Sequence, residues 1–422
     1  MKNTHRRSFV KQLFTGVAGT FLLSSYRGVE TKESIPFLDS KDDSEAFWEN
    51  VKKQFKFAPK LRYFNNGSLG ASPIPVQNAT NEFRATLDGY PSKYMWGGWY
   101  EEKENVRQKV ATLFSVSKEE IALNHNTTEG MNLIARSFNL NKGDEIILID
   151  HEHKSAVVPW TVWQEEKGIK LVRPVIPIMP KSVAEIVKVY EDAITPKTKI
   201  ISMCHVINTN GMILPVKEVS EMAHKKGILV AVDGAQAPGM FNINLKDLGC
   251  DFYTASAHKW LFAPKGISIF YAKEESQHHL KPLMVANGHK NKTIRRLENY
   301  NTRNLPELLG LGSAVDFHNN IGKQKISERS FELKRYFRDK VKDNPKFKLK
   351  TPELDDLSCG IQTLEVVGQN VRNVRVQLRD KYHIDVRPMS TFGLNGLRIS
   401  LAIFITKKDI DYLVDALETI VG

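Results

Sequence analysis

The sequence predicts an α/β protein with a mostly parallel sheet that has helices on both faces, followed by a smaller α+β unit at the C-terminus. Short apolar runs alternate with stretches of helical periodicity between residues 100 and 272, which is typical of parallel strands joined by helical crossovers. After residue 305 the pattern changes to long helical stretches and then to short strands. The composition, 41% hydrophobic and 26% charged over 422 residues, excludes a disordered or fibrous protein.

The individual elements follow from periodicity and turn signals. The first helix is predicted over residues 99–114, where apolar residues recur with the 3.6-residue period. Predicted strands follow at 120–125, 144–150, 169–176, 199–206, 228–233, 251–257 and 266–272, with helices at 155–163, 181–194 and 216–226. The last two strands are too close for a long crossover, so one of them is expected to be antiparallel. The C-terminal unit has predicted helices to residue 342, strands at 360–366, 384–389 and 397–404, and a final helix from Lys407.

The charge pattern argues against a nucleic-acid partner. The formal net charge is +12, but five bases and no acid fall in the first 28 residues, and the remaining surplus is interspersed with acids. Charges of both signs in alternation indicate a solvated surface. The three cysteines, Cys204, Cys250 and Cys359, lie far apart without a C-x-x-C spacing, so neither a disulfide framework nor a metal site is expected.

Residues 1–28 resemble a twin-arginine signal segment. Arg6 and Arg7 are followed by a mildly apolar run over residues 13–23, which is too short for a typical membrane span. We therefore expect export by the twin-arginine machinery to the periplasm. No clear cleavage motif follows, so retention of the segment as an anchor on the outer side of the inner membrane stays open. This pathway carries folded chains, often with a cofactor, and residues 29–45 form a polar lead to the folded part.

Three polar motifs lie where an α/β fold binds ligands. Asp233 ends an apolar strand, at the sheet edge that open α/β folds use. Ser256, His258 and Lys259 follow within the next turn between strands, and the turn NTTEG at 126–130 precedes a helix whose N-terminus suits a phosphate. Each motif alone has another interpretation: a helix cap for Asp233, a surface lysine for Lys259, and a capping box for the threonine turn.

Together the motifs resemble the class V aminotransferase family of fold type I pyridoxal-phosphate enzymes. SAHKW at 256–260 is similar to the family's Ser-x-His-Lys pattern, and AVDGAQA at 231–237 to its Asp-x-x-Gln pattern. The resemblance covers about residues 60–420, and the loop NNGSLGAS at 65–72 is most similar to the isopenicillin N epimerase branch. It implies a seven-stranded sheet, a pyridoxal 5'-phosphate cofactor, a large domain at 46–305 with a substrate-side loop at 63–73, and a small domain at 306–422.

The resemblance also implies roles for the residues around the cofactor ring. Lys259 matches the lysine that holds the cofactor aldehyde as a Schiff base and later acts as base at the substrate α-carbon. Asp233 matches the carboxylate that faces the pyridine nitrogen. Gln236 and Asn208 match residues beside the ring oxygen. His153 matches a histidine stacked on the ring, although the sequence also allows a surface histidine there.

Further positions are implied for the phosphate and the substrate. The phosphate ligands implied by the resemblance are Thr127, Thr128, Ser256 and His258. Thr302 falls where family members place a threonine that reaches the phosphate of a neighbouring subunit, which implies a homodimer with shared active sites. Arg398 matches an arginine that binds the α-carboxylate of the substrate, with a structural salt bridge as the other interpretation. Asn65 lies in the loop on the substrate side.

The reaction is expected to be transamination, epimerisation or elimination on an amino-acid substrate. The sulfur-transferring members use a cysteine shortly before the arginine, but residues 389–397 contain none, so cysteine desulfurase or selenocysteine lyase activity is the less favoured alternative. An epimerase needs proton donors on both faces of the substrate. Tyr94, Trp96, Trp99 and Tyr100 are candidates for the second face, or else core residues. A non-catalytic binding protein with this fold is a further alternative.

Overall fold

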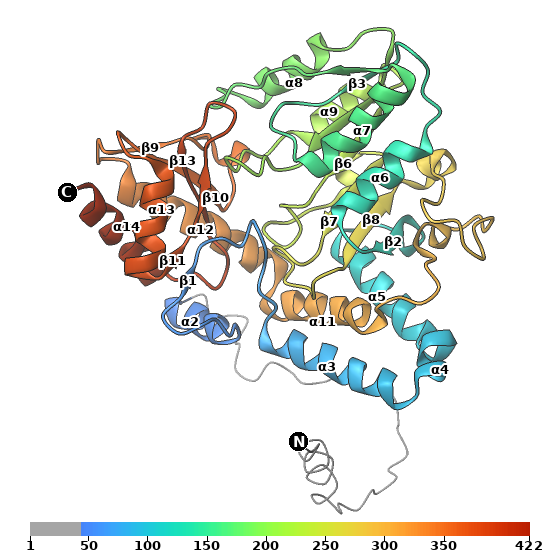
Figure 1. Ribbon diagram of the computed structural model, residues 1–422, viewed down its shortest axis with the longest axis horizontal. Coiled ribbons are helices and arrows are strands. Elements are labelled where there is room, and N and C mark those ends of the chain that lie inside the picture. The colour runs from blue at the N-terminus through green and yellow to red at the C-terminus, as the bar shows by residue number, and fades with distance from the viewer. Residues whose placement is uncertain (1–43) are drawn as a thin grey trace, which may run out of the picture. The chain divides into compact units, whose positions relative to one another are not determined.

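The computed structural model describes residues 44–422 (Figure 1). The twin-arginine segment and nearly all of the polar lead lie outside these residues, so export and periplasmic location stay predictions. The described residues belong to one compact unit, and the division into a large and a small domain also stays a prediction. Within this part of the chain no helix is long and apolar enough to cross a membrane.

A seven-stranded sheet forms the centre of the fold, as expected. Its strand order is β2-β8-β7-β6-β5-β3-β4. Only β8 runs antiparallel among the described strands of this sheet, which confirms the expectation of one antiparallel partner. The strands are β2 (Ile121–Asn124), β3 (Glu145–Ile147), β4 (Lys170–Val172), β5 (Thr198–Cys204), β6 (Leu229–Asp233), β7 (Phe252–Ser256) and β8 (Ser268–Ala272). The middle strands are buried over nearly their whole length, as parallel strands covered on both faces must be.

Helices cover both faces of this sheet. On one face, α6 and α7 pack against each other and share a core with the strands that includes Trp160, Ala231 and Phe252. On the other face, α9 packs on β6 and contacts α8 and α10. The helices are α5 (Tyr100–Leu113), α6 (Thr127–Ser137), α7 (Lys154–Lys167), α8 (Val183–Asp192), α9 (Val216–His224) and α10 (Leu245–Leu248). Serine, asparagine and histidine side chains cap four of them at the N-terminus, in α6, α7, α8 and α10.

The C-terminal part has its own antiparallel sheet with the order β12-β13-β10-β9. Its strands are β9 (Phe347–Leu349), β10 (Ile361–Val366), β12 (Arg387–Met389) and β13 (Gly396–Ser400). The helices beside it are α12 (Lys323–Val341), α13 (Val371–Tyr382) and α14 (Lys407–Val421), shown in orange to red in Figure 1. The long helix α11 (Leu305–Ile321) precedes them and packs against α3 (Ile74–Gly89) and α5.

The first described segment joins the C-terminal part instead of the sheet that follows it in sequence. Helix α2 (Glu45–Lys53) is tied to α12 by the ion pair Glu45–Arg329, at 2.8 Å. Strand β1 (Arg62–Tyr63) pairs in parallel with β11 (Ile384–Asp385). The chain then crosses back over the central sheet through residues 64–73. Neither pairing was predicted, because a two-residue strand has no periodicity to read.

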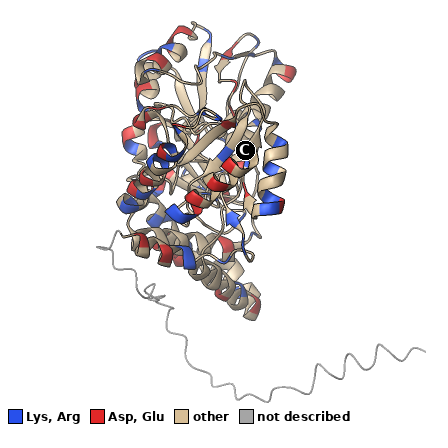
Figure 2. Ribbon diagram, turned by 90° about the vertical axis from the view of Figure 1, so that its left-hand side faces the viewer, with Lys and Arg blue, Asp and Glu red and all other residues tan. Residues whose placement is uncertain are grey.

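Acidic and basic side chains are interspersed on the helices that face the viewer in Figure 2. Some ion pairs of the described residues have spacings of three or four residues, such as Lys188–Asp192 and Lys342–Asp339. Such exposed pairs contribute little to stability, because water and salt screen them. The positive net charge is therefore distributed over a mixed surface on this side.

Candidate active site

A cavity of about 360 Å³ lies at the carboxyl ends of β5, β6 and β7, the edge at which open α/β sheets bind ligands. Its size is within the usual range for a small-molecule site. The lining residues come from the ends of five strands, β2, β3, β5, β6 and β7, with the segments that follow them, and from the loop at 63–73: Ser68, Asn126, Thr127, Thr128, His151, His153, Ser155, Cys204, Val206, Asn208, Asp233, Ala235, Gln236, Ser256, His258 and Lys259. Nine of the twelve residues predicted for the site are in this set.

Asp233 lies at the last position of β6, with only 5% of its surface exposed. One carboxylate oxygen accepts a hydrogen bond from the backbone N–H of Ala235, at 2.9 Å. Burial raises the pKa of Asp233, while this hydrogen bond and the charge of Lys259 oppose the rise. A buried carboxylate with so few partners is suited to a cationic ligand group in the cavity.

Lys259 follows β7 and reaches the same cavity. Burial lowers the pKa of Lys259 to about 8; Asp233 raises it, and the nearby Arg398 and Arg387 lower it further. A lysine with such a pKa has a large neutral fraction close to physiological pH. The neutral amine is the form that attacks a carbonyl group, so Lys259 is prepared to form an imine with an aldehyde.

This pKa predicts how pyridoxal phosphate attaches to the cofactor-free protein. The rate of attachment should rise about tenfold per pH unit below pH 8 and level off above it, because only neutral Lys259 reacts. Stopped-flow absorbance at a series of pH values measures this rate. A rate that kept rising to about pH 10.4, the ordinary range of lysine, would contradict the perturbed pKa.

The loop at residues 63–73 packs directly on the turn that carries Lys259. The N–H of Gly70 donates to the carbonyl of His258 at 3.0 Å. A Cβ atom on Gly70 would come within 2.1 Å of the carbonyl oxygen of Lys259, so only glycine permits this approach. Gln236 joins the two segments, because its amide donates to Gly67 and accepts from the indole of Trp260, at 2.8 and 2.9 Å.

One end of the cavity has the groups that a phosphate requires. The side chains of Thr127 and Ser256 join the start of α6 to the end of β7 through three hydrogen bonds of 2.8 to 3.0 Å. Thr128 is exposed at the same helix N-terminus and donates to Ser155. His258 has a buried Nδ1 without a partner, and burial, with Lys259 and Lys265 nearby, lowers its pKa to about 4. A helix N-terminus with hydroxyl groups and an unsatisfied ring nitrogen fits a phosphate.

His153 and Asn208 lie in the segments that follow two neighbouring strands, β3 and β5. His153 is exposed and caps the N-terminus of α7, where its Nδ1 accepts from the N–H of Ser155 at 3.2 Å. Burial of the ring and nearby cations lower the pKa of His153 against the pull of Asp233, so the imidazole is mostly neutral and able to stack on a ring. Asn208 lines the cavity, and its backbone carbonyl accepts a hydrogen bond from Arg398.

Arg398 on β13 is almost completely buried, at 2% exposure. Its guanidinium donates to three neutral acceptors, the carbonyl of Asn208, the side chain of Asn65 and the hydroxyl of Ser68, at 3.0, 3.3 and 2.6 Å. It forms no ion pair with any described residue, so the structural salt bridge considered above is wrong. Burial and Arg387 lower its pKa to about 9. A buried arginine without an acid is suited to a carboxylate that arrives with a ligand.

The structure also reveals a buried acid that the sequence did not single out. Glu152 is 5% exposed, one oxygen accepts from the N–H of Cys204 at 2.8 Å, and the other has no partner. Burial and the charge of Asp233 raise its pKa to about 8, so the carboxyl group is largely protonated at neutral pH. Cys204 itself lines the cavity next to Asp233 in the neighbouring strand. The pairings of β3 with β5 and of β5 with β6 bring these groups together, and no spacing in the sequence signals them.

Arg398 and Asn65 are not lining residues but bond to Ser68, which is one, whereas two other sets of predicted residues lie away from this cavity. Thr302 is exposed in the loop before α11. Of the four aromatic residues considered for the second face, Tyr94, Trp99 and Tyr100 line a separate cavity of about 310 Å³, and Trp96 is 63% exposed. Within one described chain they are therefore not part of the Lys259 site. They lie after α3, at the N-terminal end of α5. Only Trp99 is a core residue.

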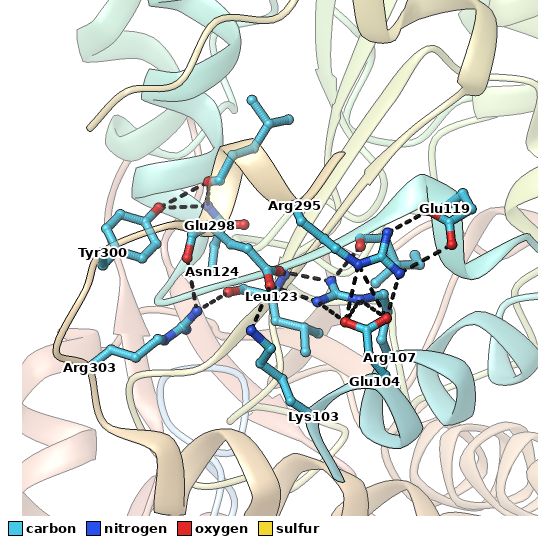
Figure 3. Close-up of polar contacts among 12 residues, drawn as sticks. Lys103, Glu104, Arg107, Glu119, Leu123, Asn124, Arg295, Glu298, Tyr300 and Arg303 are labelled. Carbon is cyan, nitrogen blue, oxygen red and sulfur yellow. Dashed lines mark hydrogen bonds and ion pairs between the residues drawn. The ribbon is translucent and has the colours of Figure 1, made fainter. Parts of the chain in front are cut away.

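A buried network of ion pairs holds the segment just before Thr302 (Figure 3). The side chain of Arg107 is fully buried and pairs with Glu104 and Glu298, at 3.1 and 2.6 Å. Arg295 pairs with Glu104 and Glu119, both at 2.5 Å. Burial raises the pKa of Glu104, but the hydrogen bonds from Arg295 and Arg107 outweigh it and lower the pKa to about 2. The network therefore stays ionised at neutral pH and fixes residues 294–298 to α5.

A lysine beside a strand-end aspartate, with a phosphate-binding helix N-terminus at the carboxyl edge of such a sheet, defines a pyridoxal-phosphate enzyme of fold type I. Comparison with known proteins agrees. The family model described as "Aminotransferase class-V" matches residues 72–413. The chain belongs to the class V aminotransferase family.

Relatives in this family have different activities. The chain is 29% identical over 394 residues to isopenicillin N epimerase of Streptomyces clavuligerus, with 89% of this chain and 99% of that protein covered. It is 30% identical over 382 residues to a probable cysteine desulfurase of Halalkalibacterium halodurans, with 85% and 92% covered. Among solved structures, the apo cysteine desulfurase of Thermococcus onnurineus NA1 is similar with a TM-score of 0.79 and 24% identity, covering 88% and 98% of the chains. That last likeness establishes the fold.

Proposed function

We propose that the protein acts on the amino group or the α-carbon of an amino acid, by transamination or epimerisation. Pyridoxal phosphate, when bound, withdraws electrons from the carbon that bears the amine. Lys259 holds the cofactor and moves the α-proton, Asp233 keeps a positive charge on the ring nitrogen, and Arg398 orients the substrate. The observation that carries the proposal is the buried Arg398, which has no acidic partner among the described residues and donates to Asn208 and Ser68, two residues that line the cavity with Lys259 and Asp233.

A screen of the purified holoprotein against L- and D-amino acids in deuterated water tests this proposal. Exchange of the α-proton for deuterium is expected for at least one amino acid. Inversion of configuration without a keto acid would identify an epimerase, and a keto acid would identify an aminotransferase. Absence of any α-proton exchange and of any keto acid would contradict the proposal.

Binding of the substrate carboxylate should depend on Arg398. We expect Arg398→Ala to raise KM for an α-amino acid about 10- to 100-fold, because a hydrogen-bonded charge pair is worth roughly 1.5–3 kcal/mol. A matched amine without a carboxylate serves as the control, since the variant and the wild type should bind it equally. An unchanged KM for the amino acid would show that another group binds its carboxylate.

Cysteine desulfurase activity is the second candidate, because two kinds of comparison include such enzymes. The three cysteines are all buried. Burial raises the pKa of Cys359 to about 12, and burial with Glu152 and Asp233 raises that of Cys204. A thiol that stays protonated is a poor nucleophile, so the structure favours the first candidate.

Replacing Cys204, Cys250 and Cys359 together by alanine should therefore leave the activity on amino acids within about threefold of the wild type, with some loss of stability from the lost packing. Sulfide release from cysteine is measured in the same samples. Substantial release by the wild type that disappears in Cys204→Ala alone would establish the desulfurase candidate instead.

We also propose that two chains form a homodimer. Thr302 lies exposed beside the aromatic cavity, and Trp96 and Tyr100 are 63% and 55% exposed there. Exposed aromatic groups around an ordered loop are common at subunit interfaces. Light scattering should give the mass of two chains, and the mass of one chain would contradict the proposal.

A further inference from the structure

A second arginine lies beside Arg398 in an arrangement that costs stability. Arg387 on β12 is the direct partner of Arg398 in the antiparallel pairing of β12 with β13. Side chains at directly opposed positions project from the same face of the sheet, and like charges there are destabilising. The charge of Arg387 lowers the pKa of Arg398, in addition to the effect of burial. The fold therefore holds two guanidinium groups together against their repulsion.

No acid compensates this pair. Arg387 donates to the hydroxyl of Ser68 at 3.2 Å, and Arg398 donates to the same oxygen at 2.6 Å. Neither arginine forms an ion pair with any residue between 44 and 422 that the structure describes. Asp385 is nearby, but it accepts from Asn65 and pairs with Arg375, at 3.2 and 3.6 Å. The two cations are thus left for an anion that residues 44–422 do not supply.

The pair faces the reactive end of the cavity. Ser68, the shared acceptor, is one of the residues that line the cavity with Lys259. Both arginines, together with burial, lower the pKa of Lys259, so their charges act at the position where a substrate amine would lie. Arg398 is buried, whereas Arg387 is exposed. The inner guanidinium is therefore placed for the carboxylate next to the α-carbon, and the outer one for a group farther along the substrate.

We propose that the substrate is an amino acid or amino-acid derivative with a second carboxylate, and that Arg387 binds this second carboxylate while Arg398 binds the first. This inference rests on the proposed function, which it makes more specific. One carboxylate between the two arginines would leave part of the positive charge uncompensated. Two carboxylates neutralise both guanidinium groups, and each can be bound in the bidentate geometry that arginine favours.

Binding to the wild-type holoprotein tests this, with matched pairs of ligands. Absorbance titrations compare glutamate with glutamine, and 2-aminoadipate with norleucine. We expect the dicarboxylic member of each pair to bind about tenfold more tightly, with a preference that decreases as salt is added. Arg387→Gln should remove this preference by weakening the dicarboxylic member of each pair more than its partner, and Arg387→Lys should restore part of it. Arg372→Gln, which removes an exposed charge from α13, is the control and should keep the preference.

A second arm uses ligands without an amino group. Glutarate should raise the unfolding temperature of the wild-type holoprotein more than butyrate does, and this difference should disappear in Arg387→Gln. If no amino acid changes the spectrum but glutarate stabilises the protein in this way, the binding of two carboxylates by Arg387 and Arg398 is supported and the proposed function is contradicted. If amino acids react without any dicarboxylate preference, or if Arg387→Gln weakens both members of a pair equally, the inference is overturned and the proposed function stands.

Discussion

Replacing Lys259 with alanine should abolish the covalent attachment of pyridoxal phosphate and lower turnover by at least roughly 10⁴-fold, because the variant lacks both the attachment point and the base. The structure offers no substitute for this lysine in the cavity. The other lysine of the same turn, Lys265, is directed to the hydroxyl of Ser72 at 3.4 Å and lines a different cavity. Borohydride reduction followed by peptide mapping should place the cofactor on Lys259 in the wild type.

Lys265→Ala is the matched control for this experiment. Burial lowers the pKa of Lys265 as well, so its reactivity alone does not distinguish it from Lys259. Only position does. The Lys265 variant should keep the reducible bond and the activity, and a small primary amine added to Lys259→Ala should restore part of the turnover. Cofactor attached to Lys265 in the wild type would refute the site.

Asp233→Asn should lower kcat by at least about 100-fold, which corresponds to about 2.7 kcal/mol of barrier. A neutral amide cannot keep a proton on the ring nitrogen, so the cofactor withdraws electrons less strongly. Glu152 is a second buried acid near Asp233, but we do not expect it to replace Asp233 as the charged partner of the ring nitrogen. Its carboxyl group is itself largely protonated at neutral pH, since burial raises its pKa to about 8. The variant should keep its cofactor and its fold, as judged by absorbance and thermal unfolding.

Asp251→Asn is the control for loss of a buried aspartate elsewhere. Asp251 is 3% exposed and bonded to His224, Ser276 and the N–H of Val230, away from the cavity. Its replacement should lower stability by about 1–3 kcal/mol through unsatisfied groups, with kcat little changed. Undiminished turnover in Asp233→Asn would mean that another group protonates the ring.

The predictions from sequence were most accurate where a strand ends in a chemically distinctive residue. Asp233, Ser256 and Lys259 are such positions, and β6 and β7 bring them to one edge. The family resemblance also implied the C-terminal arginine, which lies 139 residues beyond Lys259, from its place at the start of a predicted strand. These features depend on local sequence, which one chain displays without any alignment.

Contacts between distant segments were not predictable in the same way. The second arginine beside Arg398 depends on the register of β12 against β13, and a shift of one residue would turn its side chain away. The acid Glu152 depends on the neighbouring strand for its burial. The aromatic turn at 94–100 lines a different cavity within one chain, and its kink at Gly97, with φ 129°, has no periodicity from which to predict that position.

The loop that contributes Ser68 to the cavity is held by residues of the C-terminal part, and this contact has a consequence for the order of folding. The N–H of Gly67 donates to the hydroxyl of Ser400 at 3.1 Å, across 333 positions of sequence, and the N–H of Gly70 donates to His258. Contacts of such long range form late, since their loop closure entropy must be overcome first. A nascent chain that still lacks its last strand has the lysine but not the closed pocket. Stable cofactor retention is therefore a property that only the completed chain acquires.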